Sequence, residues 1–378
     1  MRIGFDAKKI VKNLTGIGNY SRCMVNALSE YYPGNRYVLF APSKGNEQAT
    51  GRLHMSQSVG FCYPSHVPGF LKEWWRCRGV VKDIDKNHIE LFHGLSNELP
   101  FGIRKAHCRS VVTIHDLIFL RYPETYTRMA RAVLRFKTRY ACRNADRIVA
   151  ISEQTKRDII QFYNIPPEKI SIVYQGCDSI YYTKVSDDKI GNVLRKYGLP
   201  ARYLLSVGTF EKRKNQKSII EALPLIDDDI HLVLVGKRTE YEKELVSAIE
   251  NCRVGGRVHV LHDVPNADLP ALYQGCSAFA YMSYFEGFGI PILEALVSGV
   301  PIVAATGSCL EEAGGPSGLY CDPFNIKSIA GQIEYVLKHP EQMAQRVEEG
   351  KNYAKRFTEG QIAKAMMDVY KLTLSSPR

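Results

Sequence analysis

Short runs rich in β-branched and aromatic residues alternate along the whole chain with stretches of helical periodicity. The first half contains RIGFDA, YVLFA, IELFH, SVVTIH, RIVAIS and ISIVY, and the second half contains YLLSVG, HLVLVG, RVHVLH, SAFAY, PIVAA and GLYCD. Strands that alternate with helices are typical of parallel sheets covered by helices on both faces. Two similar sets of runs predict two doubly wound α/β domains rather than one large sheet.

The length of the chain also favours two domains, because 378 residues with 45% apolar composition exceed one ordinary hydrophobic core. The polar stretch Asp178–Gly198 is the candidate linker. The last 25 or so residues predict a single helix, because apolar side chains recur there three to five positions apart. These side chains are Phe357, Ile362, Met366 and Tyr370.

Two sequence features bear on the cellular compartment. No apolar run approaches the roughly 18 residues that a membrane-spanning helix needs, and Asp6 comes too early for a signal peptide. The ten cysteines form no CxxC pair and no ligand-spaced cluster with histidine, so we expect reduced core cysteines rather than disulfides or zinc. These features predict a cytoplasmic protein, either free or bound peripherally to the inner face of the cell membrane.

The net charge of +11 is concentrated in one segment. Between Gly102 and Arg147 there are eleven Lys or Arg residues and three Asp or Glu residues, which favours an anionic partner. Five arginines recur there at helical spacing, with apolar residues between them. They are Arg128, Arg131, Arg135, Arg139 and Arg143. An arginine-striped amphipathic helix is either a solvated surface or a docking face for anionic lipid, and Trp74 and Trp75 could join that face.

A glycine-containing loop, TGIG, precedes the first long helical stretch. Gly16 and Gly18 would let backbone N–H groups approach a phosphate at a helix N-terminus. Ser21 stands where a dinucleotide fingerprint has its third glycine, so a nicotinamide cofactor is not expected. A flexible surface turn explains the same residues equally well.

Polar residues follow two strand runs of the first domain. His115 and Asp116 come after SVVTI, and His93 begins a second polar loop, HGLSN. Active-site groups of open α/β sheets lie beyond the carboxyl ends of strands, which makes His115 a candidate. An isolated histidine is also common as a structural residue.

The second domain begins with a strand, a cationic loop and a helix, in YLLSVGTFEKRKNQKSIIEAL. Gly208 ends the strand run, and Arg213 and Lys214 follow in the loop. Two cations at this position can neutralise a diphosphate, since arginine binds two oxygens and lysine acts as a point charge.

The stretch EGFGIPILE sets two carboxylates, Glu286 and Glu294, around a glycine turn. Pro291 suits the first turn of a helix, so Glu286 is expected in the preceding loop and Glu294 about one turn inside the helix. Carboxylates accept hydrogen bonds from paired sugar hydroxyls, and a diphosphate can bind at the helix end. A nucleotide sugar fits this pattern.

With these motifs the chain resembles the family 4 retaining glycosyltransferases of the GT-B fold. Their signature is the glutamate pair around a glycine turn, and it occurs here in order with TGIGNY, TIHDLIFLRYPE, VAISEQTKRDI, GTFEKRKN and SCLEEAGG. The resemblance implies two Rossmann-like domains that face each other across a cleft. Residues 1–180 would bind the acceptor, residues 181–355 would bind the nucleotide sugar, and residues 356–378 would form a helix that packs back on the first domain.

The resemblance also implies residue roles. The donor sugar and its ribose would be held by Glu286, Phe288, Gly289, Ile290 and Glu294. The diphosphate and hexose would be contacted by Arg213, Lys214, Gly16, Gly18 and His115. The nearest likeness is to bacterial mannosyltransferase-like members, from the GIGNY, TIHD and GTFEKRKN blocks, so GDP-mannose is the favoured donor.

The function predicted from this resemblance is metal-independent hexosyl transfer with retention, from a nucleoside-diphosphate sugar to a saccharide or lipid-linked acceptor. The product would be a bacterial surface polysaccharide such as lipopolysaccharide or capsule. No cofactor and no nucleic-acid partner are expected. The alternatives are a nucleotide-sugar epimerase, a hydrolase with the two glutamates as its catalytic pair, and a basic protein that only binds membrane or nucleic acid.

Overall fold

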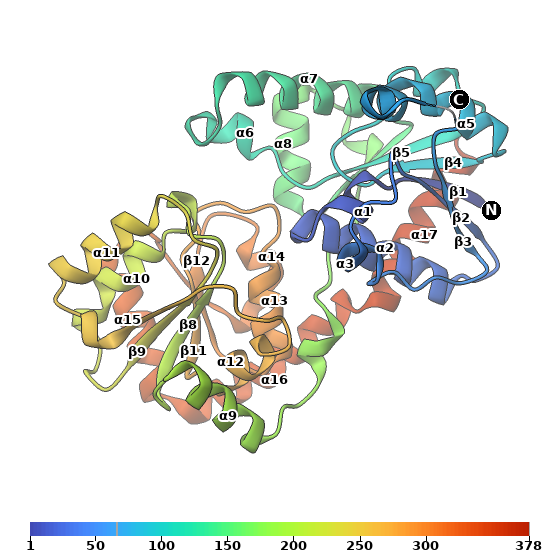
Figure 1. Ribbon diagram of the computed structural model, residues 1–378. Coiled ribbons are helices and arrows are strands. Elements are labelled where there is room, and N and C mark those ends of the chain that lie inside the picture. The colour runs from blue at the N-terminus through green and yellow to red at the C-terminus, as the bar shows by residue number, and fades with distance from the viewer. Residues whose placement is uncertain (66, 378) are drawn as a thin grey trace. The chain divides into compact units, whose positions relative to one another are not determined.

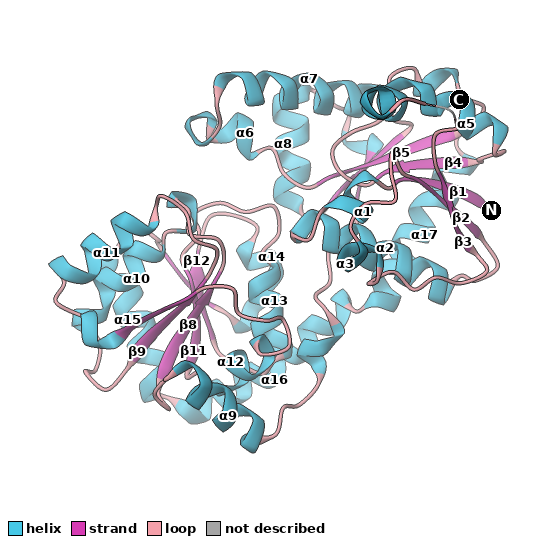
Figure 2. Ribbon diagram, in the orientation of Figure 1, coloured by secondary structure: helices cyan, strands magenta, loops and turns pink. Residues whose placement is uncertain are grey.

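The computed structural model describes residues 1–65 and 67–377. The chain forms two compact units. The first contains Met1–Gly176 together with the C-terminal segment that begins at Phe357, and the second contains Cys177–Arg356. Figure 1 traces the chain through both units, and Figure 2 shows that each is a sheet between helices. The predicted doubly wound α/β class is confirmed for both.

The described part of the first unit contains one parallel sheet in the order β3-β2-β1-β4-β5-β6-β7. Its strands are β1 (Arg2–Asp6), β2 (Arg36–Phe40), β3 (Val59–Cys62), β4 (Leu91–Gly94), β5 (Arg109–Ile114), β6 (Arg147–Ala150) and β7 (Ile170–Ile172). Six of these strands coincide with predicted runs, and β3 does not. The central strands are buried along their length, which explains their almost continuous apolar sequences.

Helices cover both faces of this sheet and bury a separate core on each. The helices are α1 (Lys8–Lys12), α2 (Gly16–Tyr31), α3 (Glu47–Thr50), α4 (Lys72–Trp74), α5 (Val80–Lys86), α6 (Ile118–Arg121), α7 (Arg128–Asn144), α8 (Glu153–Tyr163) and α17 (Glu359–Ser375). On one face, Leu28 of α2 packs with Met366 and Tyr370 of α17. On the other, Ile84 of α5 and Ile159 of α8 pack against the sheet. The last helix is therefore part of the first unit's core.

The second unit, as far as it is described, contains a parallel sheet in the order β10-β9-β8-β11-β12-β13. Its strands are β8 (Tyr203–Val207), β9 (His231–Val235), β10 (Val258–Leu261), β11 (Ala278–Tyr281), β12 (Ile302–Ala305) and β13 (Leu319–Cys321). All six coincide with the runs predicted for the second half. The register pairs apolar residues of neighbouring strands, such as Leu205 of β8 with Val233 of β9.

The helices of the second unit again lie on both faces of its sheet. They are α9 (Asp187–Tyr197), α10 (Gln216–Ala222), α11 (Glu242–Asn251), α12 (Leu269–Gly275), α13 (Ile290–Val297), α14 (Leu310–Gly314), α15 (Ile326–Lys338) and α16 (Pro340–Ala354). Figure 1 shows the strands between α10, α11 and α15 on one side and α12, α13 and α14 on the other.

The predicted linker Asp178–Gly198 is wrong, because most of this stretch is folded within the second unit. It contains α9, which begins after Ser186, whose side chain accepts a hydrogen bond from the Lys189 amide. The helix ends at Gly198, whose φ of 61° is a typical helix C-cap conformation. The stretch is polar because Val193 is the buried residue of α9 and the other faces meet solvent.

Candidate active site

The topological switch point of the second sheet lies between β8 and β11. Connections from β8 lead outward to β9 and β10, whereas β11 lies on the other side of β8 and leads to β12 and β13. The loops after these two strands therefore leave the sheet in opposite directions, and ligands of open α/β sheets bind at such points. The loop after β8 carries Arg213 and Lys214, and the loop after β11 carries Glu286.

Hydrogen bonds fix these two loops to one another. The Tyr284 amide donates to the Arg213 carbonyl at 3.1 Å, and the Arg213 guanidinium donates back to the Phe285 carbonyl. At the end of β8, Gly208 has a φ of +155°, which glycine adopts readily and other residues do not. This conformation turns the chain out of the strand towards the cationic loop.

The Glu286 side chain is the centre of the resulting cluster. Its Oε1 atom lies 2.8 Å from Arg213 Nη1 and 2.6 Å from Lys214 Nζ. The same oxygen accepts hydrogen bonds from the Tyr281 hydroxyl at 3.0 Å and the Ser283 hydroxyl at 2.6 Å. Within the described residues, Oε2 has no such partner, so it is the oxygen that can accept a hydroxyl of a ligand.

The ionisation of Glu286 is set by two opposing effects. Burial alone would raise its pKa, but Lys214 and Arg213 stabilise the carboxylate and hold the pKa at about 2. The pKa of Arg213 is raised correspondingly, although burial opposes that shift, because Glu286 and Glu211 face it. Glu286 and Arg213 are therefore both charged near neutral pH, and Arg213 and Lys214 place two cationic side chains side by side where an anionic ligand can bind.

The glycine turn leads from this cluster into α13. Gly289 has a φ of +111°, a conformation that side-chain-bearing residues rarely adopt, so glycine is favoured there. Helix α13 begins directly afterwards at Ile290, as predicted from Pro291. The first N–H groups of a helix have no acceptor within the helix, so Gly289 and Ile290 present donors beside Glu286.

Glu294 lies about one turn inside α13, apart from the cationic cluster. Its Oε2 accepts a hydrogen bond from the Tyr273 hydroxyl at 2.8 Å. Among the described residues it has no cationic partner. Withdrawal from water therefore dominates and raises its pKa to about 7, against the hydrogen bonds from Tyr273 and Tyr181. The two glutamates of the motif thus have opposite electrostatic environments.

In the first unit, His115 is buried at the end of β5. Its Nε2 donates to the Leu95 carbonyl at 2.8 Å, which leaves Nδ1 to accept from the Gln175 amide at 3.1 Å. The Tyr20 ring contacts the imidazole edge to face at 4.7 Å. Burial lowers the pKa of His115 to about 4, so the ring is neutral at pH 7 and both of its nitrogens are occupied by protein groups.

The two glycines of the TGIG loop differ in their surroundings. Helix α2 begins at Gly16, and a Cβ atom on Gly16 would meet nothing within 4 Å. A Cβ atom on Gly18 would lie 1.9 Å from the Asn13 carbonyl oxygen. Gly18 is therefore needed for packing against Asn13, whose Oδ1 also accepts from the Gly18 amide at 3.2 Å, whereas Gly16 has open space beside it. Tyr20, one turn further along α2, connects this helix to His115.

The structure thus brings Arg213, Lys214 and Glu286 into direct contact, with Gly208 and Gly289 in the flanking turns. Sequence reasoning missed the hydroxyl groups that complete the site. These are Tyr181, Tyr273, Tyr281 and Ser283, all in the second unit. The positions of Tyr281 and Ser283, at and just after the end of a strand run, carried a signal for their role.

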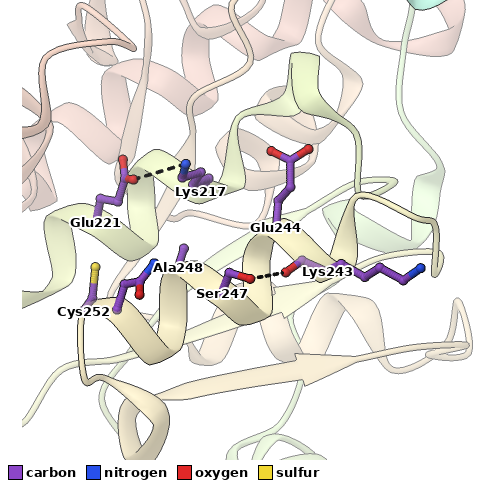
Figure 3. Close-up of a pocket in the computed structure, with 8 residues that line it drawn as sticks. Lys217, Glu221, Lys243, Glu244, Ser247, Ala248 and Cys252 are labelled. Atoms are coloured by element: carbon purple, nitrogen blue, oxygen red, sulfur yellow. Dashed lines mark hydrogen bonds and ion pairs between the residues drawn. The ribbon is translucent and has the colours of Figure 1, made fainter.

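Other polar features of the chain do not resemble this site. Asp83 and Asp85 lie in α5, where Asp83 accepts from Trp75 Nε1 at 2.6 Å and Asp85 accepts from the His107 amide. In the described ranges, no group of three or more His, Cys, Asp or Glu side chains is arranged to hold a metal ion. Figure 3 shows a polar pocket between α10 and α11, where Lys217 pairs with Glu221 at 3.6 Å.

Comparison with known proteins agrees with this architecture. The first unit matches the family model "Glycosyltransferase Family 4" over residues 14–179, and the second matches "Glycosyl transferases group 1" over residues 195–353. O-antigen chain mannosyltransferase B of Escherichia coli is 28% identical, and the match covers 98% of this chain and all of that protein. O-antigen chain mannosyltransferase RfbU of Salmonella typhimurium is 26% identical over 68% of this chain and 71% of its own length.

A solved structure shows the same fold. HepE of Anabaena, crystallised with UDP and glucose, superposes with a TM-score of 0.73 at 21% identity, covering 98% of this chain and all of that one. The two family models lie side by side and together account for most of the sequence. The chain therefore belongs to the GT-B glycosyltransferases, with a family 4 domain followed by a group 1 domain.

Proposed function

We propose that the protein transfers mannose from GDP-mannose, with retention of anomeric configuration, to a saccharide or lipid-linked acceptor in bacterial surface polysaccharide synthesis. The observation that carries this proposal is the cluster of Arg213, Lys214 and Glu286 at the switch point of the second sheet. Full-length similarity to an O-antigen mannosyltransferase supports the sugar and the pathway class.

Cationic side chains would bind the diphosphate of the donor, and carboxylates at other positions would accept hydrogen bonds from its sugar hydroxyls. Arg213 and Lys214 bind the diphosphate, and the N–H groups of Phe288, Gly289 and Ile290 lie at the N-terminus of α13, where anions are favoured. Glu286 accepts a mannose hydroxyl through Oε2, while its Oε1 stays with the two cations. Glu294 accepts the ribose hydroxyls. Gly208 gives the diphosphate close access to the backbone.

From the first unit, we propose contacts of Gly16, Gly18 and His115 with the donor. Gly16 is the first residue of α2 and has open space beside it. Because both nitrogens of His115 are already hydrogen-bonded and its pKa is about 4, the residue packs against the sugar with its ring and transfers no proton. Its orientation is fixed by Leu95 and Gln175.

In the proposed reaction, the bond between the anomeric carbon and the diphosphate oxygen breaks, and a bond to the acceptor oxygen forms on the same face. The acceptor hydroxyl gives its proton to the departing diphosphate. Negative charge accumulates on that leaving group, and Arg213 and Lys214 are preorganised by Glu286 to stabilise it. These cations supply the charge that the step requires, so the proposed reaction needs no metal ion.

The acceptor class implies a place of action. Within the described residues, no helix is long and apolar enough to cross a bilayer. We propose that the protein works in the cytoplasm and contacts the anionic inner surface of the membrane peripherally. The contact is made through Arg128, Arg131, Arg135, Arg139 and Arg143. A lipid-linked acceptor would be presented at the same surface.

The proposal is tested by calorimetric titration with GDP-mannose, UDP-glucose and ADP-glucose, followed by transfer assays with the sugar that binds. GDP-mannose is expected to bind best, and NMR of the product should show the anomeric configuration of the donor. The alternatives give different outcomes: an epimerase converts the donor without acceptor, and a hydrolase cleaves oligosaccharides without nucleotide sugar. Binding of RNA with no affinity for any nucleotide sugar would contradict the proposal.

A further inference from the structure

Helix α7 has apolar side chains on a face that the protein core does not cover. Its core side is formed by Thr138, Ala141 and Cys142, which are buried. Met129, Val133 and Phe136 are 80%, 48% and 64% exposed. At about 100° per residue these three side chains fall within a stripe about 60° wide, roughly opposite the core side. The helix is therefore apolar on two faces, and only one of them is used in folding.

The charge of α7 is of one sign. The helix contains five arginines and Lys137 and no acidic residue. Lys137 pairs with Glu98 at 3.2 Å, but among the described residues the five arginines have no carboxylate partner. By the same helical geometry Arg128, Arg139 and Arg143 lie along one border of the exposed apolar stripe, whereas Arg131 and Arg135 lie towards the core side. An ordinary solvated surface explains the arginines, but it does not explain the three apolar side chains beside them.

Another exposed aromatic residue lies in the same unit. Trp74 is 58% exposed, whereas its neighbour Trp75 is 4% exposed and belongs to the core. This region is linked to α7, because the Phe101 amide donates to the Cys77 carbonyl at 2.7 Å and the Phe101 ring lies 5.8 Å from that of Phe136. Of the two tryptophans that the sequence offered for a membrane surface, Trp74 alone remains available.

We propose that α7 lies in the plane of an anionic bilayer surface and inserts Met129, Val133 and Phe136 among the lipid chains. This deepens the peripheral location proposed above and rests on it for the lipid-linked acceptor. Unpaired arginines match lipid phosphates, and a stripe of three apolar residues matches the boundary between headgroups and acyl chains. A nucleic acid could bind the arginines, but it would leave Met129 and Val133 in water. A protein partner would bind this face whether or not anionic lipid is present.

The test is sedimentation of the full-length protein with vesicles, without donor or acceptor. Vesicles of 30% phosphatidylglycerol in phosphatidylcholine should bind the protein, and vesicles of pure phosphatidylcholine should not. The variant M129S/V133S is expected to weaken binding at least tenfold. V246S is the matched control, because Val246 on α11 is 46% exposed and lies in the other unit, and it should bind normally. Phe136 is left unchanged because its ring contacts Phe101.

A second variant separates insertion from charge attraction. R128E/R139E is expected to weaken binding by more than about 25-fold, since each arginine near an anionic surface contributes about fivefold. If M129S/V133S binds as well as the unmodified protein, the apolar stripe does not insert and the proposal is wrong. Equal binding to both vesicle types overturns the proposal as well. So does a protein that binds RNA but not the anionic vesicles.

Both variants should keep the thermal unfolding midpoint of the unmodified protein. They should also keep its affinity for GDP, because the proposed GDP site lies in the other unit. Vesicle binding is measured without sugar nucleotide. A variant that fails to bind vesicles therefore does not contradict the proposed transferase activity. Conversely, a protein that fails to bind GDP-mannose but still binds anionic vesicles through Met129 and Val133 refutes the proposed function alone.

Discussion

Replacement of Glu286 by glutamine tests whether Glu286 binds the sugar while Arg213 and Lys214 bind the diphosphate. Glutamine keeps the shape of the side chain, and its oxygen can still accept from Ser283 and Tyr281. Its amide nitrogen occupies the position of Oε2, however, and cannot accept a sugar hydroxyl. Arg213 and Lys214 remain in place but lose their counter-charge. The variant therefore removes sugar recognition without removing the groups that bind diphosphate.

The expected loss follows from the structure. A hydrogen bond to a charged acceptor contributes about 1.5–3 kcal/mol, which corresponds to roughly 10- to 150-fold in kcat/KM. Affinity for GDP, which has no mannose, should stay the same or increase, because the cations no longer pair with Glu286. The pKa of about 2 also implies that E286Q destabilises the second unit by about 3 kcal/mol near neutral pH.

The assay measures mannose transfer and GDP binding on the same preparations, after urea denaturation has established how much folded protein is present. E221Q is the control, because Glu221 is a surface carboxylate of the same unit that pairs with Lys217 at 3.6 Å, and it should change neither quantity (Figure 3). The reasoning is refuted if folded E286Q transfers mannose within threefold of the unmodified protein. It is also refuted if GDP affinity falls in parallel with transfer.

Three further predictions concern other residues. Lys214→Ala should lower kcat roughly a hundredfold, because Lys214 stabilises the departing diphosphate; a change confined to KM would contradict this role. The ribose hydroxyls of the donor would bind the ionised form of Glu294, whose pKa is about 7, so donor affinity should fall about eightfold between pH 7.5 and 6. Titration calorimetry should find no such pH dependence in Glu294→Gln. Tyr370→Phe should cost about 1–3 kcal/mol in urea denaturation, because His93 Nδ1 loses its partner at 2.7 Å; an unchanged midpoint would contradict this.

The fold was largely predictable because most of the strands are buried and even the half-buried edge strands β7, β10 and β13 are mainly apolar. Each of the twelve apolar runs corresponds to a strand, since a parallel strand covered on both faces must be apolar almost throughout. The run VGFC of β3 escaped notice because it is short, contains Gly60 and lies at the edge of its sheet. The helix α9 was mistaken for a linker because only one of its residues, Val193, is buried.

The site was predictable only where neighbours in sequence are also neighbours in space. Glu286, Gly289 and Glu294 lie in one turn and one helix, so their spacing carried the information. The contact between Lys214 and Tyr281 joins residues 67 positions apart, and no local pattern indicates it. The neutral state of His115 likewise depends on Leu95 and Gln175, which come from other loops.

The two glutamates of the motif illustrate why spacing alone does not define chemistry. Glu286 and Glu294 are both withdrawn from water, and burial alone would raise both pKa values. Two cations on the neighbouring loop lower that of Glu286 to about 2, whereas Glu294 faces tyrosine hydroxyls and Asp178 and rises to about 7. Glu286 therefore remains a fixed anion that holds the cations in position, and Glu294 is an anion that a ligand must help to form.

The stability contributed by Glu286 is lost as the pH falls from 4.5 towards 2. That contributed by protonated Glu294 is lost as the pH rises from 4.5 through 7. Donor binding should consequently release a proton near pH 6 through Glu294 and none through Glu286.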